Sequence, residues 1–335
     1  MRRRSLYFTA PRCAALLEDA APAPASGQVR VRTLLSAISP GTELLIYRGE
    51  APAQMSADAS IAALGGGLQF PLKYGYSCVG VVDALGADVP AEWVGRRVFA
   101  FNPHEDVFVA DVRDLHVVPD DVENDDAVLL PNMESAVNFV MDARPWIGER
   151  AVVVGQGVVG LLTTALLSRM PLTSLISVEK LALRRGWSMR MGAHESIDPS
   201  DADAFARIGE QSDVTFELSG APAAVDTALA VTGYGGRVIL GSWYGAKPVT
   251  VDLGGRFHRS RIRLEASQVS TLAPELGARW TKQRRLDVAW RMLREVRPSQ
   301  LISARLSFDE AAHGHRMLDE RAADVLQVIF EYQRR

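Results

Sequence analysis

The 335-residue chain is poor in cysteine, contains no long apolar run and has no excess of charge of one sign. Its two cysteines, Cys13 and Cys78, cannot build a disulfide framework or a four-cysteine zinc site. Lys and Arg number 37 and Asp and Glu number 40, so the formal charge of −3 indicates neither nucleic acid nor an anionic membrane surface as a partner. No run is long enough to span a bilayer, and Pro11 and Glu18 interrupt any signal-peptide-like segment. These absences predict a soluble, cytoplasmic protein.

The first 130 or so residues are expected to be rich in β-strands. Residues 28–34 alternate polar and apolar side chains, as a half-buried strand does, and residues 79–82 and 97–101 are further short strands between turn residues. The glycine-rich segment 62–68 has two interpretations, a loop on the substrate side or a mobile linker.

The pattern changes near residue 131 to an alternation of strands and helices. Four apolar runs, each followed by a turn or a helix-like stretch, are expected to be strands: 151–154, 175–178, 213–218 and 236–240. Regular alternation of this kind predicts a parallel, doubly wound α/β sheet. Two of the strands lead into Ser219-Gly220 and Gly241-Ser242. These residues fall at the strand ends where such sheets bind ligands, so we predict that they contact a cofactor.

The first of these strands runs into a G-x-G-x-x-G motif that opens the next helix. Gly155 permits a tight turn, Gly157 lets a pyrophosphate approach the backbone, and Gly160 lets the helix and the strand pack closely. The helix N-terminus offers free N–H groups and a partial positive charge to phosphates. The motif therefore predicts a dinucleotide site that consists of Gly155, Gln156, Gly157, Val158, Val159 and Gly160.

The second strand ends at Glu179, roughly 20 positions beyond the glycines, where a ribose hydroxyl is held in such sites. A carboxylate there accepts hydrogen bonds from the ribose and repels a 2′-phosphate. Lys180, Arg184 and Arg185 follow closely, and a nearby arginine can hold that phosphate. Their alternative role is the solvated face of a helix start. We predict NAD as the cofactor, with NADP as the alternative.

Five stretches of the sequence form a recognisable set: residues 36–43 with 47–49, 74–80, 155–160, 178–179 with 192–193, and 218–220. Together they resemble the medium-chain dehydrogenase/reductase superfamily, the zinc-type alcohol dehydrogenase-like proteins, over essentially the whole chain. The resemblance implies a β-rich, GroES-like catalytic domain in residues 1–131 and 269–335 and a Rossmann dinucleotide-binding domain in residues 132–268. It also implies a homodimer formed at sheet edges, with 249–253 or 256–265 as the candidate region.

The positions at which zinc-dependent members of this superfamily carry metal ligands hold other residues here. Pro40 replaces a cysteine, Tyr76 replaces a histidine, and Leu130 and Pro131 stand near the third ligand. A catalytic zinc needs three Cys, His or carboxylate ligands, and Glu43, a candidate oxygen donor, is expected to lack imidazole partners. We therefore predict no zinc, catalytic or structural. The variant motifs show a weaker similarity to the branch that includes bacteriochlorophyllide a dehydrogenase, which does not imply a tetrapyrrole substrate.

Without a Lewis acid, the reacting oxygen needs hydrogen-bond donors or a general acid from the protein. The resemblance implies that Thr42 contacts this oxygen. Its alternative role is a hydrogen bond from its hydroxyl to the backbone of its own turn. Tyr76 either donates a proton in place of the metal or only fills the space that the zinc ion and its ligands occupy in zinc-dependent members. His104 is the histidine best placed near the catalytic cleft, and imidazoles exchange protons near neutral pH. Glu134, at the domain crossover, is either a base or a helix cap. The other five histidines are expected to be structural: His116, His194, His258, His313 and His315.

The sequence thus predicts a zinc-independent, NAD(H)-dependent oxidoreductase that interconverts a secondary alcohol and a ketone on a small-to-medium polar substrate. Two alternatives remain open. The first is an NADPH-dependent enone or quinone reductase, because reduction of a conjugated double bond requires less stabilisation of charge on the substrate oxygen. Glu179 argues against this alternative, since its carboxylate disfavours NADPH. A dinucleotide-binding sensor or partner protein without catalysis would also combine intact glycines with an eroded metal site.

Overall fold

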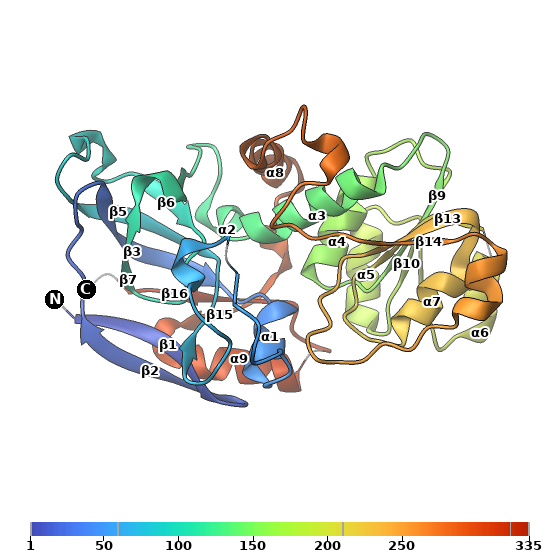
Figure 1. Ribbon diagram of the computed structural model, residues 1–335, viewed down its shortest axis with the longest axis horizontal. Helices are drawn as coiled ribbons and strands as arrows, with labels where there is room; N and C mark the ends of the chain where they lie inside the picture. Colours follow the sequence, from blue (N-terminus) through green and yellow to red (C-terminus); the bar gives the residue numbers. More distant parts are fainter. Residues whose placement is uncertain (1, 59, 210, 322, 334–335) are drawn as a thin grey trace. The chain divides into compact units, whose positions relative to one another are not determined.

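The structure, a computed structural model, describes residues 2–58, 60–209, 211–321 and 323–333. The chain forms two compact units (Figure 1). Unit 1 consists of Met1–Pro131 and Arg297–Arg335, and unit 2 consists of Asn132–Val296. The first boundary coincides with the predicted one. The second differs, because residues 269–296, which we expected in the N-terminal domain, group with unit 2.

Unit 1 is built on two sheets. A hairpin of β1 (Arg2–Ala10) and β2 (Cys13–Ala20) pairs with β4 (Leu72–Lys73) to give three strands in the order β2-β1-β4. The second sheet has the order β15-β16-β3-β5-β6-β8, with β7 also paired to β3. Its strands are β3 (Gln28–Ala37), β5 (Cys78–Leu85), β6 (Arg97–Ala100), β7 (Val107–Asp111), β8 (Leu115–Val117), β15 (Ile302–Ser307) and β16 (Gln327–Glu331).

The expected alternation in the strand at residues 28–34 is present in β3. Val29 and Val31 are buried, and the intervening Arg30 is partly exposed. The buried side chains meet Val82, Val98 and other apolar residues of the facing strands, so the core of unit 1 lies on this face. The helices of the unit are α1 (Thr42–Tyr47), α2 (Asn124–Ala127) and α9 (Ala311–Glu320).

Unit 2 contains a parallel sheet in the order β11-β10-β9-β12-β13-β14. Its strands are β9 (Arg150–Val154), β10 (Ser174–Val178), β11 (Glu195–Ile197), β12 (Ser212–Glu217), β13 (Thr232–Leu240) and β14 (Arg263–Ala266). Each of the four strands expected from the sequence is present. Numbered within the sheet, the order is 3-2-1-4-5-6, which is that of the dinucleotide-binding fold. The prediction of a doubly wound parallel sheet is therefore confirmed.

Helices connect these parallel strands and cover the sheet (Figure 1). They are α4 (Val158–Leu167), α5 (Ala182–Arg190), α6 (Ala202–Ile208) and α7 (Ala224–Val231), with α3 (Leu130–Ala143) before the sheet and α8 (Lys282–Val296) after it. The chain reverses its direction of winding between β11 and β12, so the strand ends of β9 and β12 flank the point at which ligands bind in such folds.

A buried arginine explains why α8 belongs to unit 2. Arg285 is 1% exposed, and its guanidinium donates to Glu134 Oε1 at 2.7 Å and to Asn138 on α3. It also donates to the carbonyl oxygens of Val269 and Thr271. A buried guanidinium needs such partners. These contacts hold α8 and the segment after β14 on the sheet unit.

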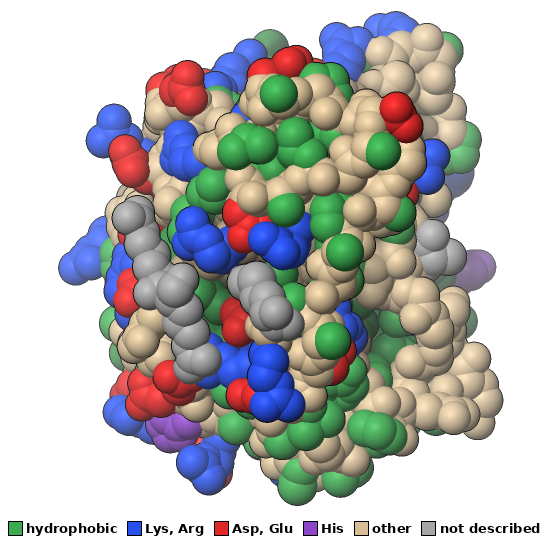
Figure 2. Space-filling view, turned by 90° about the vertical axis from the view of Figure 1, so that its left-hand side faces the viewer, with side chains coloured by type: hydrophobic (Ala, Val, Ile, Leu, Met, Phe, Trp, Pro, Cys, Tyr) green, Lys and Arg blue, Asp and Glu red, His purple; other side chains and the backbone are tan. Residues whose placement is uncertain are grey.

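The surface carries both signs of charge. Figure 2 shows acidic, basic and apolar side chains mixed on one face of the molecule. Opposite charges pair within unit 1, as Arg30 does with Asp83 at 2.8 Å. Among the described residues, no helix is both long enough and apolar enough to cross a lipid bilayer.

Candidate functional site

The turn between β9 and α4 has room for a ligand at one of its three glycines. Gly155 has φ of 91°, and a Cβ there would lie 2.6 Å from the Cα of Ser219. At Gly160 a Cβ would lie 2.1 Å from the carbonyl oxygen of Gly155. Gly157 differs, because the nearest atom to its Cβ position is Nη1 of Arg184 at 4.0 Å. Gly157 also begins α4 without a side-chain cap, so the first N–H groups of the helix are available to phosphate oxygens.

Glu179 links the end of β10 to this turn. Its Oε2 accepts a hydrogen bond from the backbone N–H of Gln156 at 2.7 Å, and its Oε1 accepts one from the N–H of Leu181 at 2.9 Å. The side chain is 9% exposed. Each carboxylate oxygen can accept more than one hydrogen bond, so both retain capacity for ribose hydroxyls. The residues of the turn and Glu179 therefore fit a dinucleotide.

The two arginines that follow Glu179 differ in their contacts. Arg185 donates to the carbonyl oxygens of Glu179 and Lys180 and pairs with Asp198 at 2.8 Å, so it stabilises its own turn. Arg184 lies against Gly157, and burial lowers its pKa despite the favourable charge of Glu179. Arg184 is thus the arginine that lies beside the turn predicted to bind phosphate.

The turns after β12 and β13 are joined by hydrogen bonds. The N–H of Gly220 donates to Oγ of Ser242 at 2.9 Å, and that hydroxyl donates to the carbonyl oxygen of Glu217 at 3.3 Å. The carboxylate of Glu217 is fully buried and accepts hydrogen bonds from the N–H of Ser219 at 2.8 Å and from the hydroxyl of Tyr244. Glu217 was not among the predicted site residues, although an acidic residue at the end of an apolar strand is a usable signal.

Three hydroxyl groups gather in unit 1 around the start of α1. Tyr76 donates a hydrogen bond to Oγ of Ser39, and Thr42 is a second hydroxyl partner of the phenol. Burial raises the pKa of Tyr76 to about 12, which keeps the phenol protonated at neutral pH. The ring of Tyr74 packs edge-on against that of Tyr76 at 6.1 Å. Predicted residues Thr42 and Tyr76 are therefore neighbours.

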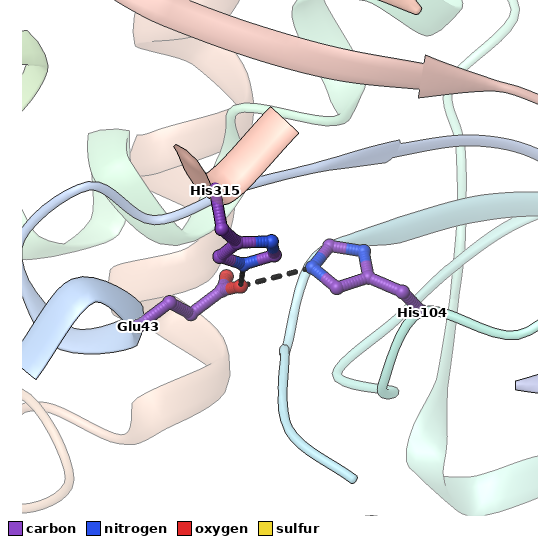
Figure 3. A group of neighbouring side chains, drawn as sticks. All are labelled: Glu43, His104 and His315. Carbon is purple, nitrogen blue, oxygen red and sulfur yellow. Dashed lines mark hydrogen bonds and ion pairs between the residues drawn. The ribbon is translucent and has the colours of Figure 1, made fainter. Parts of the chain in front are cut away.

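Glu43, which follows Thr42, contacts two imidazoles (Figure 3). Its Oε2 lies 3.0 Å from Nε2 of His104 and 2.9 Å from Nε2 of His315. All three side chains are fully buried. The expectation that Glu43 lacks imidazole partners was therefore wrong, because residues 61 and 272 positions away in the sequence meet it in the fold. Among the described residues, this is the one group with the composition of a metal site.

The four candidate catalytic residues thus fall in two places. Thr42, Tyr76 and His104 lie together in unit 1, where Gly75 packs so closely that a Cβ there would lie 2.9 Å from Nε2 of His104. Glu134 belongs to unit 2 and pairs with Arg285. Burial raises the pKa of Glu134, and the charge of Arg285 offsets only part of that rise. The catalytic roles of all four residues stay predictions.

The comparisons with known proteins agree with this architecture. No protein-family model matches the chain. D-guloside 3-dehydrogenase of Escherichia coli K12 is 28% identical over 314 residues, which are 87% of this chain and 88% of that protein. The alcohol dehydrogenase RspB of Escherichia coli CFT073, solved with NADH, superposes with a TM-score of 0.80 at 18% identity, covering 98% and 99% of the two chains. A dehydrogenase of Sinorhizobium meliloti 1021 bound to NADP superposes with a TM-score of 0.79 at 18% identity, covering 99% of each.

The parallel sheet, its glycine turn and these dehydrogenase relatives support an NAD(P)-dependent oxidoreductase. Its homologues and structural neighbours are zinc-type alcohol dehydrogenase-like proteins of the medium-chain dehydrogenase/reductase superfamily, and the chain shares their fold of a Rossmann and a GroES-like domain. The resemblance and the fold class inferred from the sequence are confirmed.

The side chains at the superfamily's zinc positions do not fit a zinc ion. Pro40 has no donor atom, the phenol of Tyr76 is protonated and bonded to Ser39, and Leu130 and Pro131 are apolar. Ser77, beside Tyr76, donates its hydroxyl proton to the carbonyl oxygen of Val128. No step of the chemistry can be assigned to a metal held by these positions.

Proposed function

We propose that the chain is an NAD(H)-dependent oxidoreductase that interconverts a secondary alcohol and a ketone on a polar, polyhydroxylated substrate, without zinc at the superfamily's ligand positions. The observation that supports this proposal is the group of Thr42, Tyr76 and Ser39, whose hydroxyls lie together around the residue that replaces the expected zinc-binding histidine in the sequence. The polyhydroxylated substrate is suggested by the relative D-guloside 3-dehydrogenase.

The nicotinamide, when bound, supplies or accepts the hydride. The chain holds the dinucleotide through the free N–H groups of α4 and the turn at Gly157, and Glu179 supports NAD over NADP. A 2′-phosphate would meet the Glu179 carboxylate, which is partly desolvated and therefore repels it strongly. Arg184 favours NADP instead, because its guanidinium lies beside the same turn and can pair with a 2′-phosphate.

Tyr76 is the group best suited to manage the proton on the substrate oxygen. Its raised pKa keeps the phenol protonated across the physiological range, and its one hydroxyl proton, donated to Ser39 in this structure, turns to the substrate oxygen when the substrate binds. Thr42 offers a second hydroxyl to the same oxygen. Such donors stabilise the charge that develops as an alkoxide forms or a ketone is reduced.

The test is a steady-state assay of the full-length protein with sugar alcohols, glycosides and their ketones, using NAD(H) and NADP(H) in parallel. We expect alcohol oxidation and ketone reduction with higher kcat/KM for NAD(H). Reduction of enones or quinones with no alcohol turnover would replace the proposal by an NADPH-type reductase. Binding of NADH without turnover on any carbonyl would instead indicate a sensor or a partner subunit.

We also propose a homodimer formed along β14. Among the described strands, β14 pairs with β13 alone and so leaves one edge without a partner, and Leu264 on this strand is 36% exposed. An open edge of a parallel sheet is normally covered. Light scattering after gel filtration should give twice the chain mass, and Leu264→Lys should shift the protein toward monomer. A wild-type monomer at micromolar concentration would contradict the proposal.

A further inference from the structure

Three buried side chains of unit 1 converge on one point: Glu43 from α1, His104 from the loop before β7, and His315 from α9 (Figure 3). Their potential ligand atoms lie within 4.8 Å of one another. They stand outside the positions at which the superfamily carries its zinc ligands. We propose that Glu43, His104 and His315 bind a divalent transition-metal ion of the zinc type, through side chains other than those of the proposed proton donors Thr42 and Tyr76. The proposal goes beyond the function above, whose chemistry does not use this ion.

The two imidazoles present the same ring nitrogen to the same carboxylate oxygen. Nε2 of His104 and Nε2 of His315 lie 3.0 Å and 2.9 Å from Oε2 of Glu43. Zinc binds such atoms at about 2.0–2.2 Å, so two of its ligands are about 3.0–3.5 Å apart at ordinary coordination angles. Small side-chain shifts suffice to admit an ion. Two imidazoles and one carboxylate form an established zinc ligand set, which leaves one coordination position for a further group.

The positions of the ring protons distinguish a metal site from an ordinary hydrogen-bonded cluster. In a metal-free cluster with neutral rings, both Nε2 atoms must carry the proton in order to donate to Glu43. Nδ1 of His315 is then a buried acceptor, and it receives no hydrogen bond of acceptable geometry. The carbonyl group of Ala311 beside it can only accept. A buried polar atom without a partner is rare and unfavourable.

A metal ion changes what each Nδ1 needs from its surroundings. When Nε2 binds the ion, the proton of each ring moves to Nδ1. In His104 that N–H lies 2.7 Å from Oγ of Ser36, and in His315 the backbone of Ala311 favours a proton on the ring. Ser36 Oγ lies 2.8 Å from the hydroxyl of Tyr332, which completes the chain of hydrogen bonds. Metal-binding histidines commonly donate their second N–H in this way.

A nearby positive charge would also stabilise the buried carboxylate of Glu43. Oε1 of Glu43 accepts only a neutral N–H, that of Ser39 at 2.7 Å, among the hydrogen bonds described for it. Phe8 packs against the ring of His315 at 4.8 Å and Phe330 against that of His104 at 5.1 Å, so the surroundings are apolar. A buried anion is unfavourable in such surroundings unless a cation pairs with it. A divalent ion supplies this charge; the competing source is a second proton on His315.

The first experiment measures metal in the full-length protein, produced without a histidine tag in medium supplemented with zinc and dialysed against a chelator. We expect about one zinc per chain in the wild type and at least a tenfold lower occupancy in His315→Gln and Glu43→Gln. His313→Gln is the matched control, because His313 lies two residues away on the exposed face of α9 and should leave the zinc content unchanged. Equal zinc in the wild type and His315→Gln would overturn the proposal.

A second measurement uses only the wild-type protein, so it does not depend on whether the variants fold. Nitrogen NMR of the histidine rings in the wild type reports which nitrogen carries a proton. Two rings with Nδ1–H and a metal-bound Nε2, together with cobalt absorption bands after substitution of one equivalent, support the site. A metal-free protein in which His315 carries protons on both nitrogens would show that an imidazolium neutralises Glu43, and would overturn the proposal.

Discussion

The carboxylate of Glu179 accepts a hydrogen bond from the backbone N–H of Gln156 at 2.7 Å. This bond joins the end of β10 to the second residue of the glycine turn, so the group proposed to select the ribose is fixed to the turn proposed to bind the pyrophosphate. We therefore expect cofactor preference to depend on the shape of the turn.

Replacing this carboxylate should change the cofactor preference. We expect Glu179→Gln to lower the ratio of kcat/KM for NAD to that for NADP by at least about tenfold, or about 1.4 kcal/mol. The amide keeps one acceptor for the turn but no longer repels a 2′-phosphate, and Arg184 beside Gly157 can then pair with that phosphate. Initial rates with both cofactors measure the ratio.

The matched control for this change is Glu195→Gln, since Glu195 on β11 is partly exposed and pairs with Arg207. It should leave the ratio unchanged. A Glu179→Gln variant that retains the wild-type ratio would mean that Glu179 only stabilises the turn.

A second prediction concerns the buried carboxylate of Glu217. Glu217→Gln should raise KM for the cofactor severalfold and lower the free energy of unfolding by about 1–3 kcal/mol, because an amide cannot accept at both positions from Ser219 and Tyr244. Asp213→Asn, at the exposed start of the same strand, is the control and should change KM little. Denaturant titration and cofactor fluorescence titration separate the two effects. An unchanged KM would show that the turns keep their shape without this carboxylate.

The sequence predicted those parts of the fold that repeat locally. Alternation in residues 28–34 and the buried runs at 151–154 and 175–178 follow periods of a few residues, and the structure confirms them. The glycine motif could also be recognised in the sequence, because its spacing is determined by one turn and the start of one helix. Sequence patterns of this range therefore sufficed for the fold class and for the position of the glycine turn.

Pairings between distant residues could not be read in this way. His315 was expected to be structural and Glu43 to lack imidazole partners, yet they meet across 272 positions through the packing of α9 on α1. The grouping of residues 269–296 with unit 2 depends on packing of the same kind. An amphipathic helix such as α8 shows which face it buries but not against which unit, and here the contacts of Arg285 decide it.

The ion pair of Glu134 and Arg285 leads to a third prediction. Removing one partner leaves a buried charge unpaired, so Arg285→Met should lower the free energy of unfolding by about 3–5 kcal/mol. Glu134→Gln should act in the same direction and keep kcat within about tenfold, since Oε1 is already bonded to the guanidinium. Arg284→Met, next in the sequence but exposed, is the control for stability. A loss of more than about 100-fold in kcat with unchanged stability would instead assign Glu134 as an acid or base.

Tyr76 carries the fourth prediction. Tyr76→Phe removes the phenol that bonds Ser39, and we expect kcat for ketone reduction to fall by about 10²-fold or more with little change in KM. Tyr74→Phe is the matched control, because its ring packs against Tyr76 but is not a proposed donor. Wild-type levels of kcat in Tyr76→Phe would leave Thr42 as the proposed donor.

The pH dependence of stability checks the same residue independently. Burial raises the pKa of Tyr76 in the folded protein to about 12, above its ordinary value of 10. The unfolded chain therefore loses this proton first, and the contribution of Tyr76 to stability is complete below pH 10 and falls as the pH rises toward 12. Tyr76→Phe should accordingly flatten the decline in unfolding free energy between these values relative to the wild type. Denaturant titrations at intervals across this window measure the slope, and equal slopes in the two proteins would show that the phenol is not desolvated as described.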